Sequence, residues 1–215
     1  MTRLIALALA VAGCASAPRP STLPPPPASQ AADTAVPLDD EVAALVMRMY
    51  ADDLALRTSA ARALGAMGGA AAGALPELVA CAATEPREAG EAPGQLGDRE
   101  PVAECARAMA AIGAEEPDAL IAALAIPLPD KERALAALAG VGAPAVPGAA
   151  AVYLDACTRG AAASEPAVRR NLETTADAAL AVLAREPDLA AEALGTGDAC
   201  REEAAERIGA LAMKR

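Results

Sequence analysis

The sequence predicts an all-α protein built from short helices that pack in pairs. Apolar residues make up 54% of the 215 positions, yet aromatic residues make up only 1%, with no Phe and no Trp. The core must therefore consist of Ala, Leu, Val and Met, and Ala both favours helix and allows two helices to approach closely. Apolar positions recur at helical spacing between Gly and Pro breaks, whereas strand-forming residues are scarce. These observations favour a row of helical hairpins.

Residues 1–13 are predicted to be a signal peptide that is removed. Arg3 supplies a positive start, an apolar run follows from Leu4 to Ala12, and this run is too short to cross a bilayer as a helix. The sequence VAGC, which ends at Cys14, resembles the bacterial lipoprotein box, in which a peptidase cuts before a lipid-modified cysteine. The resemblance implies that Cys14 carries lipid and becomes the first residue. The alternative is an ordinary secretory signal with a cysteine nearby.

The residues after Cys14 predict which membrane would hold the lipid anchor and how the folded part would be attached to it. Ala15 differs from the Asp that marks lipoproteins kept in the inner membrane, so the resemblance implies a cell-envelope address at the outer membrane, facing the periplasm. Residues 14–37 are rich in Pro, Ala, Ser and Thr and predict a disordered tether, because few apolar side chains can offset the entropy of ordering. At a polyproline rise of ~3.1 Å per residue, the tether would reach roughly 70 Å from the membrane.

The folded domain is expected over residues 38–215 and begins with a helix at 39–50. Asp39 or Asp40 would cap this helix, and Leu38 would pack against an apolar residue that follows. We expect the helix to cover the open N-terminal end of the hairpins.

The first hairpin is predicted at about 53–83. An apolar stripe ends at Met67, Gly68 and Gly69 break the helix, and a second apolar helix follows. The segment 83–101 is loaded with Gly, Pro and charged residues and is predicted to be a loop.

Three further hairpins are predicted at about 100–126, 130–159 and 164–195, and a terminal helix at 198–213. The segments AARALGAMG and ALPELV of the first hairpin resemble the HEAT repeat, in particular the short bacterial type first described in phycobilin lyase-like proteins. Weaker copies begin at Cys105, Arg133 and Ala176. The resemblance extends from residue 53 to the C-terminus. It implies an alpha-alpha superhelix, a solenoid that offers a long exposed face to a partner.

The spacing of these units is uneven. The apolar residues that end the first helix of each unit are 45, 29, 42 and 28 positions apart, at Met67, Ile112, Val141, Leu183 and Leu211. The first long interval contains the predicted loop. The second predicts a longer helix over 167–184, with Ser164 as its cap.

Four more cysteines, Cys81, Cys105, Cys157 and Cys200, predict disulfides if the protein is exported. The order of the HEAT-like units favours Cys81 with Cys105 and Cys157 with Cys200. Alternatively these are ordinary buried thiols, since Cys105 and Cys157 lie on apolar helix faces. No close pair of cysteines is present to start a zinc site, so no metal is predicted.

Charge and composition argue against catalysis and against nucleic-acid binding. The chain has no His, the usual catalytic base and metal ligand. Paired acids such as Asp52 and Asp53 lie at helix starts, where they stabilise the helix dipole, so neither an active site nor a cofactor is predicted. The net charge of −11, or −12 once Arg3 is removed, repels phosphate backbones and suits a basic protein partner.

The two aromatic residues are the remaining candidates for contact, because aromatic side chains dominate binding hot spots. Tyr153 lies in an apolar stripe and is predicted to be core, whereas Tyr50 ends the first helix and is the candidate partner contact. The sequence therefore predicts a non-enzymatic, lipid-anchored scaffold that binds a protein partner. The alternatives are a structural spacer of an envelope assembly and a lyase-like enzyme related to the phycobilin lyases.

Overall fold

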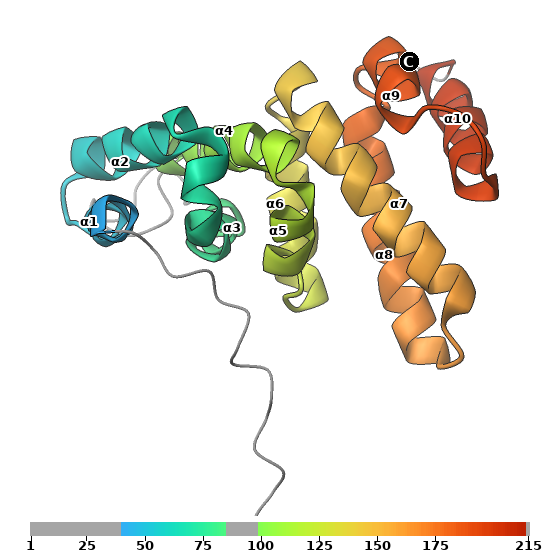
Figure 1. Ribbon diagram of the computed structural model, residues 1–215, viewed down its shortest axis with the longest axis horizontal. Coiled ribbons are helices and arrows are strands. Elements are labelled where there is room, and N and C mark those ends of the chain that lie inside the picture. Colours follow the sequence, from blue (N-terminus) through green and yellow to red (C-terminus); the bar gives the residue numbers. More distant parts are fainter. Residues whose placement is uncertain (1–39, 85–98, 214–215) are drawn as a thin grey trace, which may run out of the picture. The chain divides into compact units, whose positions relative to one another are not determined.

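The computed structural model describes residues 40–84 and 99–213, and these ranges form helices with no strand (Figure 1). The all-α fold class predicted from the sequence is confirmed for this part of the chain. The predicted signal peptide, Cys14, the tether, Leu38, Asp39 and most of the predicted loop lie outside the described residues.

The first two helices are α1 (Asp40–Met49) and α2 (Leu54–Ala66). α1 buries Val42, Val46 and Met49 on one face. α2 starts where the Asp53 carboxylate accepts a hydrogen bond from the Ala55 backbone N–H at 2.7 Å, which satisfies a donor that the first turn leaves open.

The break after α2 falls at the predicted glycines. Gly68 has a φ of +57°, and the 3₁₀ segment η2 (Gly68–Ala74) leads into α3 (Leu75–Ala82). Glu115, which ends α4 (Arg99–Glu115), accepts a hydrogen bond from the Gly69 backbone N–H at 2.7 Å. The positive φ of Gly68 favours glycine, and a Cβ there would lie 2.6 Å from the Glu115 Oε1 and so displace this carboxylate.

The rest of the chain continues the succession of helices. They are α5 (Pro117–Ala123), α6 (Leu128–Ala139), the 3₁₀ turn η3 (Ala143–Ala145), α7 (Val146–Ala162), α8 (Pro166–Leu183), α9 (Pro187–Leu194) and α10 (Ala199–Ala212). Proline occupies one of the first two positions in most of them, from α5 to α9. Its missing N–H costs no helical hydrogen bond there, so proline fixes where these helices begin.

The second long interval between units differs in part from its prediction. α8 begins at Pro166 with Glu165 at the capping position, so Ser164 is not the cap. α7 has 17 residues and α8 has 18, against 7 in α5 and 12 in α6. Both helices are therefore longer. α8 has no Gly or Pro after its first residue, whereas α7 continues through Gly148 and Gly160.

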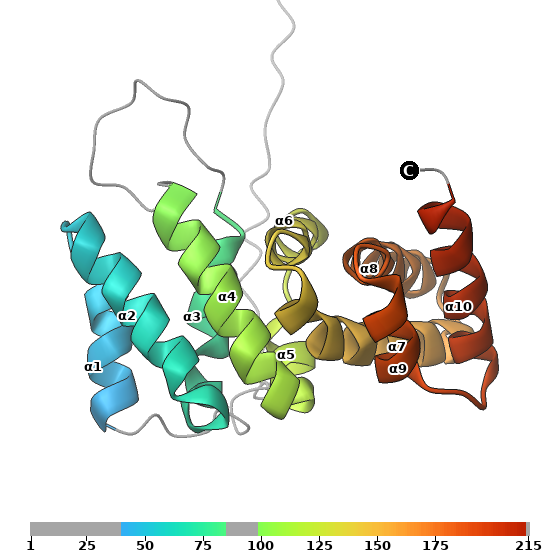
Figure 2. The ribbon, with the colours of Figure 1, turned by 90° about the horizontal axis from the view of Figure 1, so that it is seen from above.

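Helices pack mainly on those of the neighbouring unit. α2, α4, α6 and α8 each contact the next of this set, and so do α3, α5, α7 and α9 (Figure 2). Extensive contacts also join α3 to α4 and α7 to α8, whereas α2 and α3 of the first predicted hairpin contact each other little. The seven-residue η2 separates these two helices, so their stability comes chiefly from α4.

Small residues set the distances between helices. A Cβ on Gly65 of α2 would lie 3.0 Å from the Ala108 Cα of α4. Leu120, which is fully buried, fills the space above two glycines, Gly113 of α4 and Gly148 of α7. The buried side chains are mostly Ala, Leu and Val, so the core relies on close backbone approach and not on large aromatic rings.

Candidate functional site

Tyr50 lies at the corner between α1 and α2, and half of it is exposed. Its hydroxyl donates a hydrogen bond to the Glu77 carboxylate of α3. This hydrogen bond, with burial and the Glu77 charge, raises the pKa of Tyr50 to about 12. The ring is therefore presented to solvent while its hydroxyl is fixed to a neighbouring helix.

The backbone of this corner is held by a buried arginine. Arg57 of α2, 4% exposed, donates from Nε to the Ala51 carbonyl and from Nη2 to the Asp52 carbonyl. These bonds satisfy carbonyls in the turn that helical bonding leaves open. The corner is thus a fixed platform for the side chains that it carries.

Exposed apolar side chains are frequent in the stretch of chain around this corner. Four of the eight large apolar side chains that are exposed in residues 40–84 and 99–213 lie within ten positions of each other. They are Met47, Tyr50, Leu54 and Leu56, which we call the corner patch. Such clusters on a soluble surface mark contact sites more often than scattered apolar residues do.

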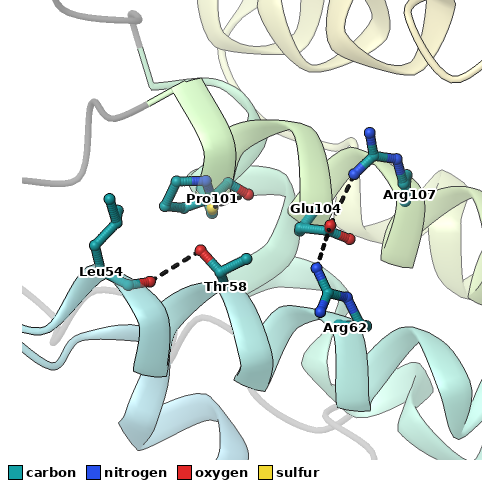
Figure 3. Close-up of polar contacts among 7 residues, drawn as sticks. Leu54, Thr58, Arg62, Pro101, Glu104 and Arg107 are labelled. Carbon is teal, nitrogen blue, oxygen red and sulfur yellow. Dashed lines mark hydrogen bonds and ion pairs between the residues drawn. The ribbon is translucent and has the colours of Figure 1, made fainter.

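A buried carboxylate joins α2 to α4. Glu104 of α4, 8% exposed, pairs with Arg62 of α2 and with Arg107 of its own helix, each at 2.8 Å (Figure 3). The hydrogen bond from Arg62 lowers the pKa of the Glu104 carboxyl below its ordinary value, although burial opposes this. Both arginines bind the same oxygen of Glu104, Oε1, and one of them belongs to the neighbouring helix, so this network has a structural role.

The four cysteines of the described chain form two disulfides. Cys81 of α3 is bonded to Cys105 of α4, and Cys157 of α7 to Cys200 of α10, with Cα–Cα distances of 6.2 and 6.0 Å. These are the pairs that the order of the units favours. The first disulfide connects the two helices on either side of residues 85–98. The second connects α10, the last helix, to α7.

Tyr153 is 1% exposed and belongs to the core. Burial raises the pKa of its hydroxyl. Of the two aromatic side chains, Tyr50 alone is available for contact.

One site was missed in the sequence. Lys131, at the start of α6, is 8% exposed and lines a cavity of about 360 Å³ between α6, α7, α8 and the end of α5. Its ammonium donates a hydrogen bond to the Asn171 Oδ1 at 3.4 Å. Burial lowers the pKa of Lys131 below its ordinary value and the charge of Arg159 lowers it further, while the charge of Asp155 opposes both. A usable signal was present, since Lys131 shares a helical face with Leu135 and Leu138, where a lysine is unexpected.

In residues 40–84 and 99–213, no three Cys, Asp or Glu side chains come together as a metal site would require. None of the helices in these ranges combines the length and the apolar character needed to cross a bilayer.

No protein-family model matches the chain, and no curated protein sequence matches it either.

Proposed function

We propose that the protein is a non-enzymatic binding scaffold of the bacterial cell envelope, anchored by lipid on Cys14 and composed of HEAT-like units. The corner patch is the surface on which it holds a protein partner. The observation that carries this proposal is the concentration of exposed apolar side chains in the stretch from Met47 to Leu56, on either side of Tyr50.

The position of the patch supports binding in preference to solubility alone. A helix that caps the end of a repeat array is expected to turn a polar face outward. α1 instead leaves Met47 72% exposed, and Tyr50 follows it at 50%. This apolar area is costly in water unless a partner covers it.

The state of Tyr50 supports a role as an anchor. Its hydrogen bond to Glu77 restricts the ring before any partner arrives. A side chain that is already restricted loses less conformational entropy on binding, which is why rigid aromatic residues are effective hot spots.

The charge around the patch indicates the chemistry of the partner. Asp52 and Asp53 lie within the corner, and Glu77 contacts Tyr50. An apolar surface with basic residues at its rim would complement this arrangement. The partner we propose is therefore a protein with an apolar contact bordered by Lys or Arg.

The packing of the helices supports the HEAT-like part of the proposal. Alternate helices contact each other in two successions, from α2 to α8 and from α3 to α9, as stacked helical repeats do. Lipid anchoring rests on the VAGC sequence alone.

A photoreactive phenylalanine analogue placed at position 50, in cells that express the full chain, tests the proposal. We expect one envelope protein to be crosslinked from position 50 and not from position 181, where the exposed Ala181 of α8 is the matched control. Met47→Glu and Leu56→Glu should abolish the crosslink, because a charge in the contact would be buried without a partner. Equal capture from both positions, or capture unaffected by both substitutions, would contradict the proposal.

The same assay separates the scaffold from the structural spacer. Replacing residues 85–98 with a short Gly-Ser linker leaves the corner patch intact, and Cys81 remains bonded to Cys105. A binding scaffold should keep its crosslink. Loss of the partner in this variant, with retention in Met47→Glu, would favour the spacer.

A further inference from the structure

Lys131 is a buried charge with no carboxylate partner among the described residues. Its single hydrogen bond goes to the neutral Asn171 side chain, although an ammonium has three donors. Asp155, on the facing helix, is bonded to Arg159 at 3.0 Å. Asp155 and Arg159 line the same cavity as Lys131, and the Asp155 charge acts on the ammonium without forming an ion pair with it. Two cations therefore share one carboxylate in the lining, and a further negative group would balance the positive charge left over.

The cavity beside Lys131 has the size and lining of a small-molecule site. Its volume of about 360 Å³ is at the low end of the ~300–1,000 Å³ typical of ligand cavities. Ile121, Leu124 and Val152 give it an apolar wall, and Asn171 adds a polar group next to the ammonium. An apolar wall with a few polar groups at one end suits an amphipathic ligand.

The choice of lysine at this position is unusual for this chain. Lys131 is one of two lysines, the other being Lys214, whereas arginine supplies the remaining 16 of the 18 basic residues. Lysine presents a compact point charge, while arginine presents a broad planar fork. The cavity therefore contains a cation that one carboxylate oxygen can approach directly.

We propose that the cleft around Lys131 binds a small organic carboxylate, with the acid group on the Lys131 ammonium and the Asn171 side chain and the apolar part along Ile121, Leu124 and Val152. The ligand balances the positive charge that Asp155 leaves over between Lys131 and Arg159, and displaces water from the apolar wall. This goes beyond the proposed function, because the cleft is formed by α6, α7, α8 and the end of α5, and not by the corner patch.

A carboxylate joined to an apolar group occurs both in a free organic acid and at the C-terminus of a peptide.

The test uses the mature chain with Cys14→Ser, exported through an ordinary secretory signal so that both disulfides form. The probes are hexanoate, its uncharged counterpart hexanol, and a short peptide that ends in Leu, with a free or an amidated C-terminus. Binding is measured by calorimetry and by NMR of isotopically labelled lysine side chains, of which the chain has two.

We expect hexanoate to shift the Lys131 resonances, to raise the pKa of Lys131, and to bind at least tenfold more tightly than hexanol. Lys131→Met should weaken hexanoate binding at least tenfold, and Lys214→Met should leave it unchanged. Lys131→Met keeps a similar volume and removes a buried charge, so its thermal unfolding should show an intact fold. The wild-type lysine resonances report on the site independently of this variant.

Equal binding of hexanoate and hexanol, unchanged binding in Lys131→Met, or no saturation by any of the carboxylates would overturn the proposal. Tighter binding of the free peptide than of hexanoate would assign the site to a protein C-terminus, and the reverse order would assign it to small acids. Equal binding of the free and the amidated peptide would show that the carboxylate is not recognised, and would also overturn it.

Discussion

At the scale of single residues, Tyr50 has a side chain that is exposed to solvent and also held in place by a hydrogen bond. The ring is half exposed, yet its hydroxyl is bonded to Glu77. The position of Tyr50 at the end of a predicted helix indicates exposure. Glu77 is 27 positions away and belongs to another helix, so this hydrogen bond depends on how α1 and α3 are placed in the fold.

This hydrogen bond predicts how the protein responds to alkaline pH. The protonated phenol is stabilised in the fold, so the stability that it contributes is present below pH 10.0 and is lost as pH rises through about 12. Glu77→Gln should bring the pKa of Tyr50 down toward 10.0, since the carboxylate that opposes ionisation is removed. Tyrosinate absorbance measures this directly, because the chain has two tyrosines and no Trp.

The matched control for this titration is Glu41→Gln on the exposed face of α1, which should leave both tyrosines unchanged. The elevated pKa of Tyr153, which comes chiefly from burial, should persist in both variants. If Tyr50 of the unmodified protein ionised at its ordinary pKa, the hydrogen bond would not exist in solution.

At the scale of helices, backbone contact replaces bulky side chains. α4, α5 and α7 meet around Leu120, with Gly113 and Gly148 beneath it. A Cβ on Gly113 would lie 2.5 Å from the Leu120 Cδ2, and Leu120 is fully enclosed and cannot turn away. The glycine therefore sets the distance between α4 and α5.

Gly113→Ala should lower the free energy of unfolding by ~1–3 kcal/mol, the usual cost of overpacking. Gly209→Ala is the matched control, because a Cβ there meets nothing within 4 Å on α10. It should raise the free energy of unfolding by roughly 0.5–1 kcal/mol through helix propensity. Urea unfolding of the oxidised protein measures both, and a change of the same sign in the two variants would refute this account.

At the scale of the whole molecule, the disulfides reinforce contacts between units. Cys81–Cys105 joins α3 to α4, and Cys157–Cys200 joins α7 to α10. In the loop-entropy account a bridge over 24 residues stabilises by ~3 kcal/mol, and one over 43 residues by slightly more. Both bridges require an oxidising compartment, which agrees with the proposed export.

The proposed lipid attachment at Cys14 predicts where the chain is found in the cell. Cys14→Ser should remain unprocessed or be released from the membrane in soluble form, since no acyl chains can be added. Fractionation of the cells, with mass measurement of the purified chain, tests this. Cys200→Ser serves as a control that removes a cysteine without touching the VAGC sequence, and should stay attached. Unchanged attachment of Cys14→Ser would contradict the anchor.

Much of the local structure could be predicted, because the signals for it act within a few residues. Asp53 caps α2, and Gly68 breaks the helix that follows through its positive φ. Pro166 and Pro187 are the first residues of α8 and α9. Ser164 was wrongly predicted as a cap, because Pro166 fixes the start of α8 two residues later and leaves Glu165 at the capping position.

The sequence by itself determined that the described chain is helical, where its helices break, and that its core must be made of small side chains. Only the tertiary structure decided which faces meet. Arg62 lies 42 positions from Glu104 and Lys131 lies 40 positions from Asn171, so neither contact has a local signal. Whether a charged side chain is buried depends on which helices pack over it. The packing of the helices depends in turn on the burial of all their apolar faces together.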